Sequence, residues 1–538
     1  MKSKIFIFAL LFSFCLWLMF ESFSYKDNIF YIADHIIYDF AVHIPLIRSF
    51  SQGDNFPPQY PLFPGEPIKY HFLFYFLVGM LEKTGLPIDW SLNIPAALGL
   101  FTLIVTLYLL TKKVFQRRLV AILTVVFLLF NGTLTFVKFL AEHPLSPTIL
   151  LDLVNNKKFY SFGPYDGGEI GAFWNLTTFT NQRHFAWGMM IGLLFILTAL
   201  NLLNRSSATK VGWAFIWGVI IGLLPFFHQS VLVIFFILIV LYFFLYPVLR
   251  PFLLVTAAIS ALLIVPQVSV FFQGNGNSIE WYPGFLIHDS LNPWHFLTYW
   301  FKNLGLHLFL IPAGLYLAPK KMRKSFLLPI FFIFLIPNLL RFSPEVATNH
   351  KFFNFAYALG SMFSAYTLVY LLDRGKRMWT VFILLLFFLT FSGVIDLFPL
   401  LNDRMHAYAD APKNEVVEWF LKNSEPDATV LNNSYIYHPA SLAGRKIFLG
   451  WPMFADSVGY DIEQRFTDFK TLWESGDISF LCQQIKKQNI SYVMYEKLGL
   501  IPGVIPKADI FDKYFPLLYE NIKEGIKIYD AKRGCKDG

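Results

Sequence analysis

Charged side chains are scarce in this sequence, because Asp, Glu, Lys and Arg together make up only 15% of its 538 residues. A soluble domain carries about 25%. Hydrophobic residues instead reach 56% of the chain. They gather in apolar runs of about 16–22 residues, the length of a membrane span, separated by short polar loops. The shortage of charge therefore excludes an ordinary soluble protein and predicts a polytopic membrane protein.

Cysteine and metal-binding motifs are also nearly absent. The chain has three cysteines, of which Cys15 lies in the first apolar run. Cys482 and Cys535 could pair if the tail faces an oxidising compartment, but two cysteines are too few for a disulfide framework. No CxxC or HExxH spacing occurs, so we predict no metal site and no cofactor. The acidic residues of the first loop leave a divalent metal open.

The formal net charge of +8 comes from Lys and Arg residues that cluster in short loops between the apolar runs. Such clustering is the positive-inside pattern of membrane proteins and does not indicate nucleic-acid binding. The polar segments 141–184, 273–303 and 341–351 are then expected on the outer face, together with the C-terminal tail. The loops expected in the cytoplasm are 112–118, 204–210, 320–324 and 373–377.

The apolar runs predict about 11–13 transmembrane helices. No small-residue cleavage site follows the first run, 4–20, so we interpret it as a retained span with its N-terminus inside. The run at 72–81 is about half as long as a bilayer requires, and whether it crosses stays open. The other runs lie near 92–111, 119–137, 185–203, 212–227, 231–247, 252–272, 304–318, 326–340, 352–372 and 379–399.

The chain changes character in its C-terminal quarter. Helical patterns at 411–424 and 455–488 alternate there with short strand patterns at 428–433, 446–450, 491–496 and 525–530. This alternation favours a layered α/β domain, and no GxGxxG or P-loop signature assigns it a nucleotide. We therefore expect an all-α polytopic membrane domain over 1–400, with an outer loop at 21–70, and a small extracytoplasmic α/β domain over 401–538.

The first long polar segment, 34–71, is unusually rich in titratable groups for so apolar a chain. It contains three Asp, one Glu, three His, one Arg and one Lys. Ionisable groups at membrane depth are costly and usually mark a substrate path. Apolar residues at helical spacing predict an amphipathic helix over 34–50 that lies on the membrane. Asp39 and His43 are four residues apart and therefore neighbours on that helix.

Basic side chains also precede three later apolar runs at their expected outer ends. These side chains are Arg183, His184, His228, His350 and Lys351. A lipid phosphate requires Arg, Lys or protonated His near its headgroup, and transfer to a hydroxyl requires a carboxylate as general base. Snorkelling anchors are the simpler interpretation of basic residues at span ends. A lysine at an outer end, however, runs against the positive-inside pattern.

The same segments resemble a known family. A first span, an Asp-bearing outer loop, many spans with short inner loops and a C-terminal outer domain are similar to the GT-C membrane glycosyltransferases. The resemblance covers nearly the whole chain and implies enzymes that use polyprenyl-phosphate sugars. The stretches that carry it are residues 38–76, NQRHFAWG (181–188), GLLPFFHQS (222–230), NHKFF (349–353) and, in the tail, VVEWFLKNSEPDATVL, SLAGRKIFLG and SYVMYE.

The resemblance implies roles for individual residues. Its catalytic carboxylate falls on Asp39 or Asp34, which are five residues apart, so the choice between them stays open. Asp39 is preferred because it stands in the YDFAVH match beside His43. The expected substrate contacts are Arg48, His71, Arg183, His184, His228, His350 and Lys351, of which Arg183, His184 and Lys351 would hold the donor phosphate.

We therefore predict an inverting hexosyl- or pentosyltransferase, which the resemblance places in a bacterial cytoplasmic membrane. It would move a sugar from a polyprenyl-phosphate donor to a saccharide, lipid or protein acceptor on the outer face. The alternative is a transporter or flippase of a lipid-linked saccharide or another polar solute. Such proteins often contain internal repeats with broken spans in matching halves. The prolines that interrupt apolar runs here show no such symmetry.

Overall fold

The structure is a computed structural model, and it describes residues 2–271, 279–287, 289–499 and 501–535. The predicted outer segment 273–303 thus lies partly outside the described residues. The chain divides into two compact units. The helical unit comprises Met1–Ser22, Ile94–Val268 and Ile279–Arg404, and the mixed unit is built mainly from Phe23–Asn93 and Met405–Gly538.

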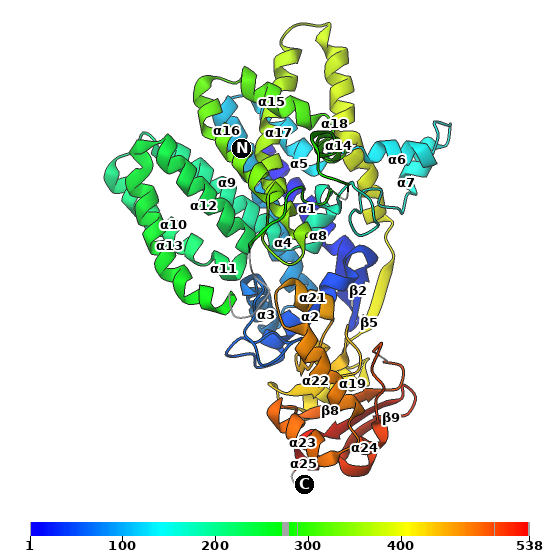
Figure 1. The fold of residues 1–538 in the computed structure, drawn as a ribbon. Helices are drawn as coiled ribbons and strands as arrows, with labels where there is room; N and C mark the ends of the chain where they lie inside the picture. The colour runs from blue at the N-terminus through cyan, green and yellow to red at the C-terminus, as the bar shows by residue number, and fades with distance from the viewer. Residues whose placement is uncertain (1, 272–278, 288, 500, 536–538) are drawn as a thin grey trace. The chain divides into compact units, whose positions relative to one another are not determined.

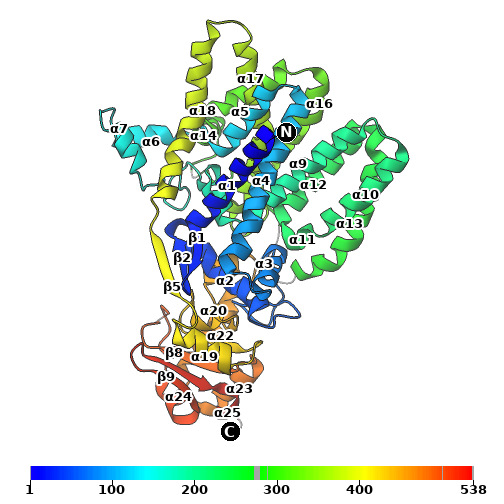
Figure 2. The same ribbon diagram turned by 180° about the vertical axis from the view of Figure 1, so that it is seen from behind.

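Every apolar run of the helical unit forms a helix (Figures 1 and 2). The helices are α1 (Lys2–Ser22), α4 (Ile88–Phe115), α5 (Arg118–Leu129), α6 (Thr135–Glu142), α7 (Ile149–Val154), α8 (Thr177–Asn181), α9 (Phe185–Leu202), α10 (Ser207–Gly222), α11 (Leu224–Phe227), α12 (Gln229–Leu245), α13 (Arg250–Phe271), α14 (Pro293–Leu304), α15 (His307–Leu317), α16 (Lys320–Leu335), α17 (His350–Leu372) and α18 (Met378–Leu401). Two short strands, β3 (Glu280–Trp281) and β4 (Leu340–Arg341), pair antiparallel.

Helix α17 forms the core of the helical unit. Nearly all of its residues are buried, and it packs against α5, α12, α15 and α16. Its contact with α15 depends on Gly314, because a Cβ there would lie only 2.2 Å from the carbonyl oxygen of Phe363. Small residues at such crossings let membrane helices approach closely.

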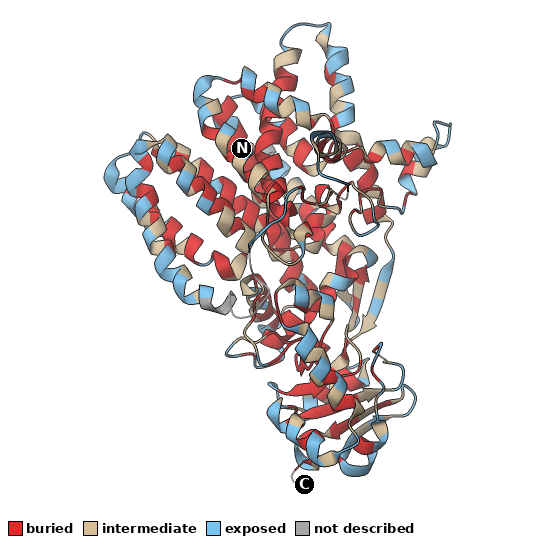
Figure 3. Ribbon diagram, in the orientation of Figure 1, coloured by how far each residue is buried: buried red, intermediate tan, exposed pale blue. Residues whose placement is uncertain are grey.

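Several helices are long and apolar enough to cross a membrane. Within the described residues there are six of them, in α1, α4, α9, α13, α17 and α18, and α5, α10, α12 and α15 are shorter apolar helices. The exposed faces of α13 and α18 carry large apolar side chains such as Leu262 and Ile383, as lipid-facing surfaces do (Figure 3). The protein is therefore a multi-pass integral membrane protein.

The short run at 72–81 forms a short helix of the mixed unit. This helix is α3 (Leu73–Lys83), whose 11 residues reach about 16 Å, about half of the hydrocarbon thickness. The helix packs in the mixed unit against α2 (Ile37–Ser51), where a Cβ at Gly79 would lie 2.8 Å from the carbonyl oxygen of Ile47.

The predicted surface helix over 34–50 is a buried helix instead. A short 3-10 turn, η1 (Asp34–Ile36), precedes α2, and every residue of α2 from Phe40 to Ser51 is buried. The prediction of a helix lying on the membrane was wrong because the polar face of α2 is covered by protein. Arg48 and Ser51 on that face bind side chains of the mixed unit, as described below.

The mixed unit joins the first outer loop to the tail. Strands β1 (Phe23–Lys26), β2 (Ile29–Ala33) and β5 (Met405–Ala409) form an antiparallel sheet in which Ile29 opposes Ala409. Asp27 and Asn28 have positive φ angles in the tight turn between β1 and β2. The compact units therefore divide the chain differently from the expected boundary at residue 400, because residues 23–93 fold together with the tail.

The tail forms the layered α/β domain that the sequence predicts. Its sheet has the order β7-β6-β8-β10-β9, with parallel pairs at β6–β7 and β6–β8 and antiparallel pairs elsewhere. Cys482 and Cys535 form a disulfide, the pairing that the sequence left open. The elements are α19 (Glu415–Asn423), β6 (Thr429–Leu431), α20 (Pro439–Leu442), β7 (Lys446–Ile447), α21 (Pro452–Ser457), α22 (Ile462–Glu474), α23 (Ile478–Lys487), β8 (Tyr492–Glu496), α24 (Ala508–Tyr514), β9 (Leu517–Asn521), β10 (Ile526–Asp530) and α25 (Ala531–Gly534).

Candidate active site

Asp39 lies half-buried in the first turn of α2, where a helix N-terminus favours a carboxylate. Two phenols of the mixed unit lie near it. Burial raises the pKa of Tyr70 and of Tyr437, and the neighbouring Asp39 carboxylate raises both further. The Tyr437 hydroxyl donates a hydrogen bond to the carbonyl of Ile37 at the start of the same helix. Asp39 is therefore a carboxylate among neutral phenols, with one side open to solvent.

The predicted partners His43 and His71 belong to a row of rings beside Asp39. His43 is buried one turn along α2 and stacks on Tyr75 at 4.5 Å between ring centroids. The His71 ring lies 3.8 Å from that of Tyr70, which in turn stacks 6.3 Å from Tyr75. The structure thus brings Asp39, His43 and His71 into one aromatic neighbourhood of the mixed unit.

The second carboxylate candidate, Asp34, has a different environment. It is exposed in η1, and its Oδ1 lies 2.5 Å from Nε2 of His406 on β5. The two candidates that the sequence could not separate are therefore distinguished by their partners. Asp34 forms a solvent-exposed pair with a histidine, whereas Asp39 lies among phenols.

Arg48 is the centre of a buried ion-pair network. Its Nε lies 2.9 Å from a carboxylate oxygen of Glu82 on α3, and its Nη2 lies 2.7 Å from Asp410, directly after β5. Ser51 donates to Glu82 and Tyr25 donates to Asp410. This arrangement fixes α2 to α3 and to the start of the tail. It gives Arg48 a structural function beside the substrate contact that the sequence predicts.

Replacing Arg48 by Met is expected to destabilise the protein by about 3–5 kcal/mol, because two buried carboxylates lose their common cation. Burial raises the pKa of Glu82 above its usual value although Arg48 lowers it. Without Arg48 this pKa rises further, so the folded state binds a proton more readily than the unfolded state, and stability increases as the pH falls. The unfolding temperature of the Arg48→Met variant should therefore lie closer to that of the parent protein at pH 5 than at pH 8.

A matched control is Arg117→Met, since Arg117 pairs with Asp373 at an exposed position. Exposed pairs contribute about 0–1 kcal/mol, so this variant should unfold almost as the parent does. Equal unfolding temperatures for the Arg48 variant and the parent would show that the network is not stabilising.

The helical unit brings together the five basic residues that the sequence singled out, here called the cationic cluster: Arg183, His184, His228, His350 and Lys351. At most 8% of each is exposed. They stand at the starts of three helices, because His184 and His228 cap α9 and α12, and His350 begins α17.

Ring contacts show that these three helix starts converge. The rings of His184 and His228 lie 5.2 Å apart. Phe185 contacts both His228, at 5.5 Å, and His350, at 5.9 Å. Lys351 is close enough to act electrostatically on both His228 and His350. Helix N-termini carry partial positive charge, so three of them beside basic side chains make an environment that suits an anion.

Two members of the cationic cluster are also held by neighbouring groups. Arg183 donates from Nη2 to the carbonyl of Met19 and to the Ser22 hydroxyl at the end of α1. His350 contacts Gln182 at 3.1 Å and Asn354 at 2.9 Å, and it stacks on Phe173. Arg183 therefore helps to hold the end of α1 in place, in addition to any contact that it makes with a substrate.

No set of three or more His, Cys, Asp or Glu side chains that could hold a metal ion occurs among the residues that the structure describes.

Sequence reasoning missed Tyr70 and Tyr437 near Asp39, and Gln182 and Asn354 around His350. Phenols and amides give no spacing signal, and Tyr437 is far from Asp39 in the sequence. The β1–β2 hairpin was also missed, although Asp-Asn between aromatic strand residues is a turn signal.

No protein-family model and no curated protein sequence matches this chain. Among solved structures, the oligosaccharyltransferase of Archaeoglobus fulgidus in complex with zinc and sulfate matches with a TM-score of 0.50 and 14% identity, over 97% of this chain and 73% of that one. Two further structures of the Archaeoglobus fulgidus enzyme each have a TM-score of 0.43 and 14% identity over 98% and 74% of the two chains. One of them is AglB with an inhibitory peptide and a dolichol-phosphate, and the other is tethered with an acceptor peptide.

The match at a TM-score of 0.50 extends over both units of this chain, and that oligosaccharyltransferase is a GT-C enzyme. At 14% identity the likeness concerns the fold. The chain therefore shares the fold of that oligosaccharyltransferase.

Proposed function

We propose that this protein is a membrane glycosyltransferase that takes a sugar from a polyprenyl-phosphate donor and gives it to an acceptor hydroxyl on the outer face of the membrane. The observation that carries the proposal is the convergence of the cationic cluster. Its five basic residues come from three separate stretches of a chain with the GT-C fold. An apolar protein has little reason to bury so many basic groups together unless they meet an anion.

The transfer needs two things from the protein, a base for the proton of the acceptor hydroxyl and cations for the charge of the leaving phosphate. The acceptor oxygen attacks the anomeric carbon, a new carbon–oxygen bond forms, and the bond to the phosphate oxygen breaks, with inversion. Asp39 takes the proton of the acceptor hydroxyl as general base. Arg183, His184 and Lys351 offset the charge of the leaving polyprenyl phosphate. Of the two carboxylate candidates, Asp39 suits the role better because it is half-buried beside the phenols of Tyr70 and Tyr437, whereas Asp34 is exposed.

The helix bounds support an outer location for the cationic cluster. Eleven helices among the described residues would cross in alternation: α1, α4, α5, α9, α10, α12, α13, α15, α16, α17 and α18. With α3 not crossing and the N-terminus inside, all four basic loops fall in the cytoplasm, as the positive-inside pattern requires. The starts of α9, α12 and α17 and the disulfide-bonded tail then face outward, where disulfides persist.

This topology predicts which added cysteines react from outside intact cells. The native cysteines leave little background, since Cys15 is buried and the other two are paired. Lys523→Cys in the tail should react with a membrane-impermeant maleimide, whereas Ser207→Cys at the start of α10 should react only after permeabilisation. Labelling of Ser207→Cys in intact cells would show that the topology is the reverse of the one proposed.

A direct transfer assay tests the function. Purified protein in lipid receives radiolabelled polyprenyl-phosphate sugars and a crude acceptor extract, and release of polyprenyl phosphate is measured. We expect release only when an acceptor is present. Accumulation of a polar solute in sealed vesicles without sugar transfer would instead identify a transporter.

A further inference from the structure

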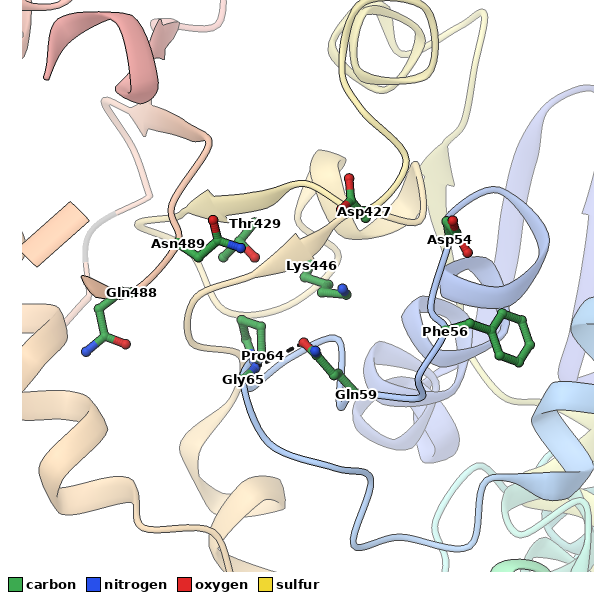
Figure 4. A pocket seen from close by; sticks show the side chains of 10 residues that line it. All are labelled: Asp54, Phe56, Gln59, Pro64, Gly65, Asp427, Thr429, Lys446, Gln488 and Asn489. Atoms are coloured by element: carbon green, nitrogen blue, oxygen red, sulfur yellow. Dashed lines mark hydrogen bonds between the residues drawn. The ribbon is translucent and has the colours of Figure 1, made fainter. Parts of the chain in front are cut away.

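A second polar pocket, of about 250 Å³, lies in the mixed unit, and neither Asp39 nor the cationic cluster lines it. One wall is the proline-rich part of the first outer loop and the other is the β7 edge of the tail sheet with the turn after α23 (Figure 4). Its polar lining includes Asp54, Gln59, Asp427, Thr429, Lys446 and Asn489.

The two walls are fixed to each other by backbone and side-chain contacts. Ile447 and Gly450 donate backbone hydrogen bonds to the carbonyls of Pro61 and Leu62, at 2.9 Å and 2.8 Å. The Arg465 guanidinium donates to the carbonyl of Pro64 at 2.8 Å and lies 4.0 Å from the centre of the Phe63 ring. The loop is therefore a bonded extension of the sheet edge, and the pocket is formed before any ligand arrives.

Lys446 is the unusual residue of this pocket. It is only 9% exposed, and Figure 4 shows its side chain extending from β7 into the space between Asp427 and Gln59. Among the described residues, no hydrogen bond or ion pair reaches its ammonium group. Burial lowers the pKa of Lys446, and the Asp427 and Asp54 carboxylates raise it from beyond ion-pair distance. The ammonium group reaches the open space of the pocket, where a ligand can accept hydrogen bonds from it.

The charges of the lining decide what kind of ligand fits. One ammonium and two carboxylates leave a net negative charge, which disfavours phosphates and uronic acids. The same groups, with the Gln59 and Asn489 amides and the Thr429 hydroxyl, offer both donors and acceptors. The volume is just below the range of about 300–1,000 Å³ that drug-sized ligands occupy, so the pocket suits one ring rather than a chain of them.

We propose that this pocket binds a neutral pyranose unit, with Lys446 donating to sugar hydroxyl oxygens and Asp427 and Asp54 accepting from sugar hydroxyl groups. The proposal extends the proposed transferase function by adding a saccharide site in the mixed unit. The pyranose could come from the acceptor glycan or from the glycan of the donor. Its test measures binding directly and uses neither a donor lipid nor turnover, so the two proposals can fail separately.

The experiment uses the full chain in lipid nanodiscs and saturation-transfer NMR with methyl glucoside, methyl galactoside, methyl mannoside and glucuronate as the observed ligands. Inorganic sulfate, which has no protons to observe, is added as a competitor. We expect at least one neutral glycoside to bind. Lys446→Met and Asp427→Asn should each raise the dissociation constant of that glycoside at least tenfold. Asp427 is exposed, so its variant keeps the test decisive if the Lys446 variant folds poorly. Lys523→Met is the matched control, since this exposed lysine lies in the β9–β10 turn at the opposite edge of the sheet.

Three outcomes would overturn the proposal. These are the absence of neutral glycoside binding, binding that both pocket variants leave unchanged, and binding of glucuronate alone with displacement by sulfate, which would identify an anion site. The Asp39→Asn protein serves to separate the two proposals. It should bind the glycoside as the parent does even where it transfers no sugar.

Discussion

Asp39→Asn is expected to abolish measurable sugar transfer, with kcat/KM lower by about 10²–10⁴-fold, the usual contribution of a general base. The amide has nearly the shape of the carboxylate but cannot take the proton of an acceptor hydroxyl. The helix that carries Asp39 is buried from Phe40 onward and is held by Arg48, so the variant should fold and insert normally. Release of polyprenyl phosphate and the unfolding temperature are the two measurements.

Asp34→Asn is the matched control for this prediction. It changes the same chemical group in the same loop, but the group is exposed and paired with His406. Its transfer rate should stay within a few-fold of the parent. Full activity of Asp39→Asn with loss of activity in Asp34→Asn would show that Asp34 is the general base. Full activity of both variants would show that neither carboxylate acts in the transfer.

Lys351→Met is expected to lower kcat/KM for the donor by about 10–150-fold, which corresponds to the loss of one charge-assisted hydrogen bond of about 1.5–3 kcal/mol. Lys351 lies at the start of α17 among the histidines of the cationic cluster and is 8% exposed. Met keeps the length of the aliphatic part of the side chain and removes the ammonium group with its charge and its donors. Lys351 is a sharper test than Arg183, because Arg183 also holds the end of α1.

Inhibition by free polyprenyl phosphate separates a phosphate contact from a structural one. The inhibition constant should rise in Lys351→Met by nearly the same factor as kcat/KM falls, and Lys351→Arg should restore most of both. Lys302→Met serves as control, since Lys302 pairs with Glu169 in a polar segment of the same unit. An unchanged inhibition constant in Lys351→Met would contradict the proposed phosphate contact.

Much of the fold could be predicted from local pattern. Each apolar run became a helix, because a backbone in lipid must satisfy its hydrogen bonds within its own segment. The tail was predicted as an α/β domain because helix and strand periods alternate in it. Strand β9 (Leu517–Asn521) was missed although Leu517, Leu518 and Tyr519 are apolar; it is an edge strand, and three of its five residues are exposed, unlike the buried residues of β6.

The environment of the candidate residues could not be predicted in the same way. The sequence identified Arg48 as a basic residue of the first loop. Its partners Glu82 and Asp410 lie in other segments of the chain, and no pattern in the sequence indicates that these segments meet Arg48. For the same reason α2 was expected on the membrane. Its polar face was visible in the sequence, whereas the protein groups that cover that face were not.

The sequence by itself determined the membrane class, the positions of the helices, the α/β tail and the identity of the basic residues at span ends, because these follow from composition and period. Only the tertiary structure decided that α3 packs on α2 in the mixed unit, and that β2 pairs with β5. It also decided that His184, His228 and His350 meet. Such contacts join residues far apart in the chain, and they depend on how whole helices and strands pack rather than on any pattern within one of them.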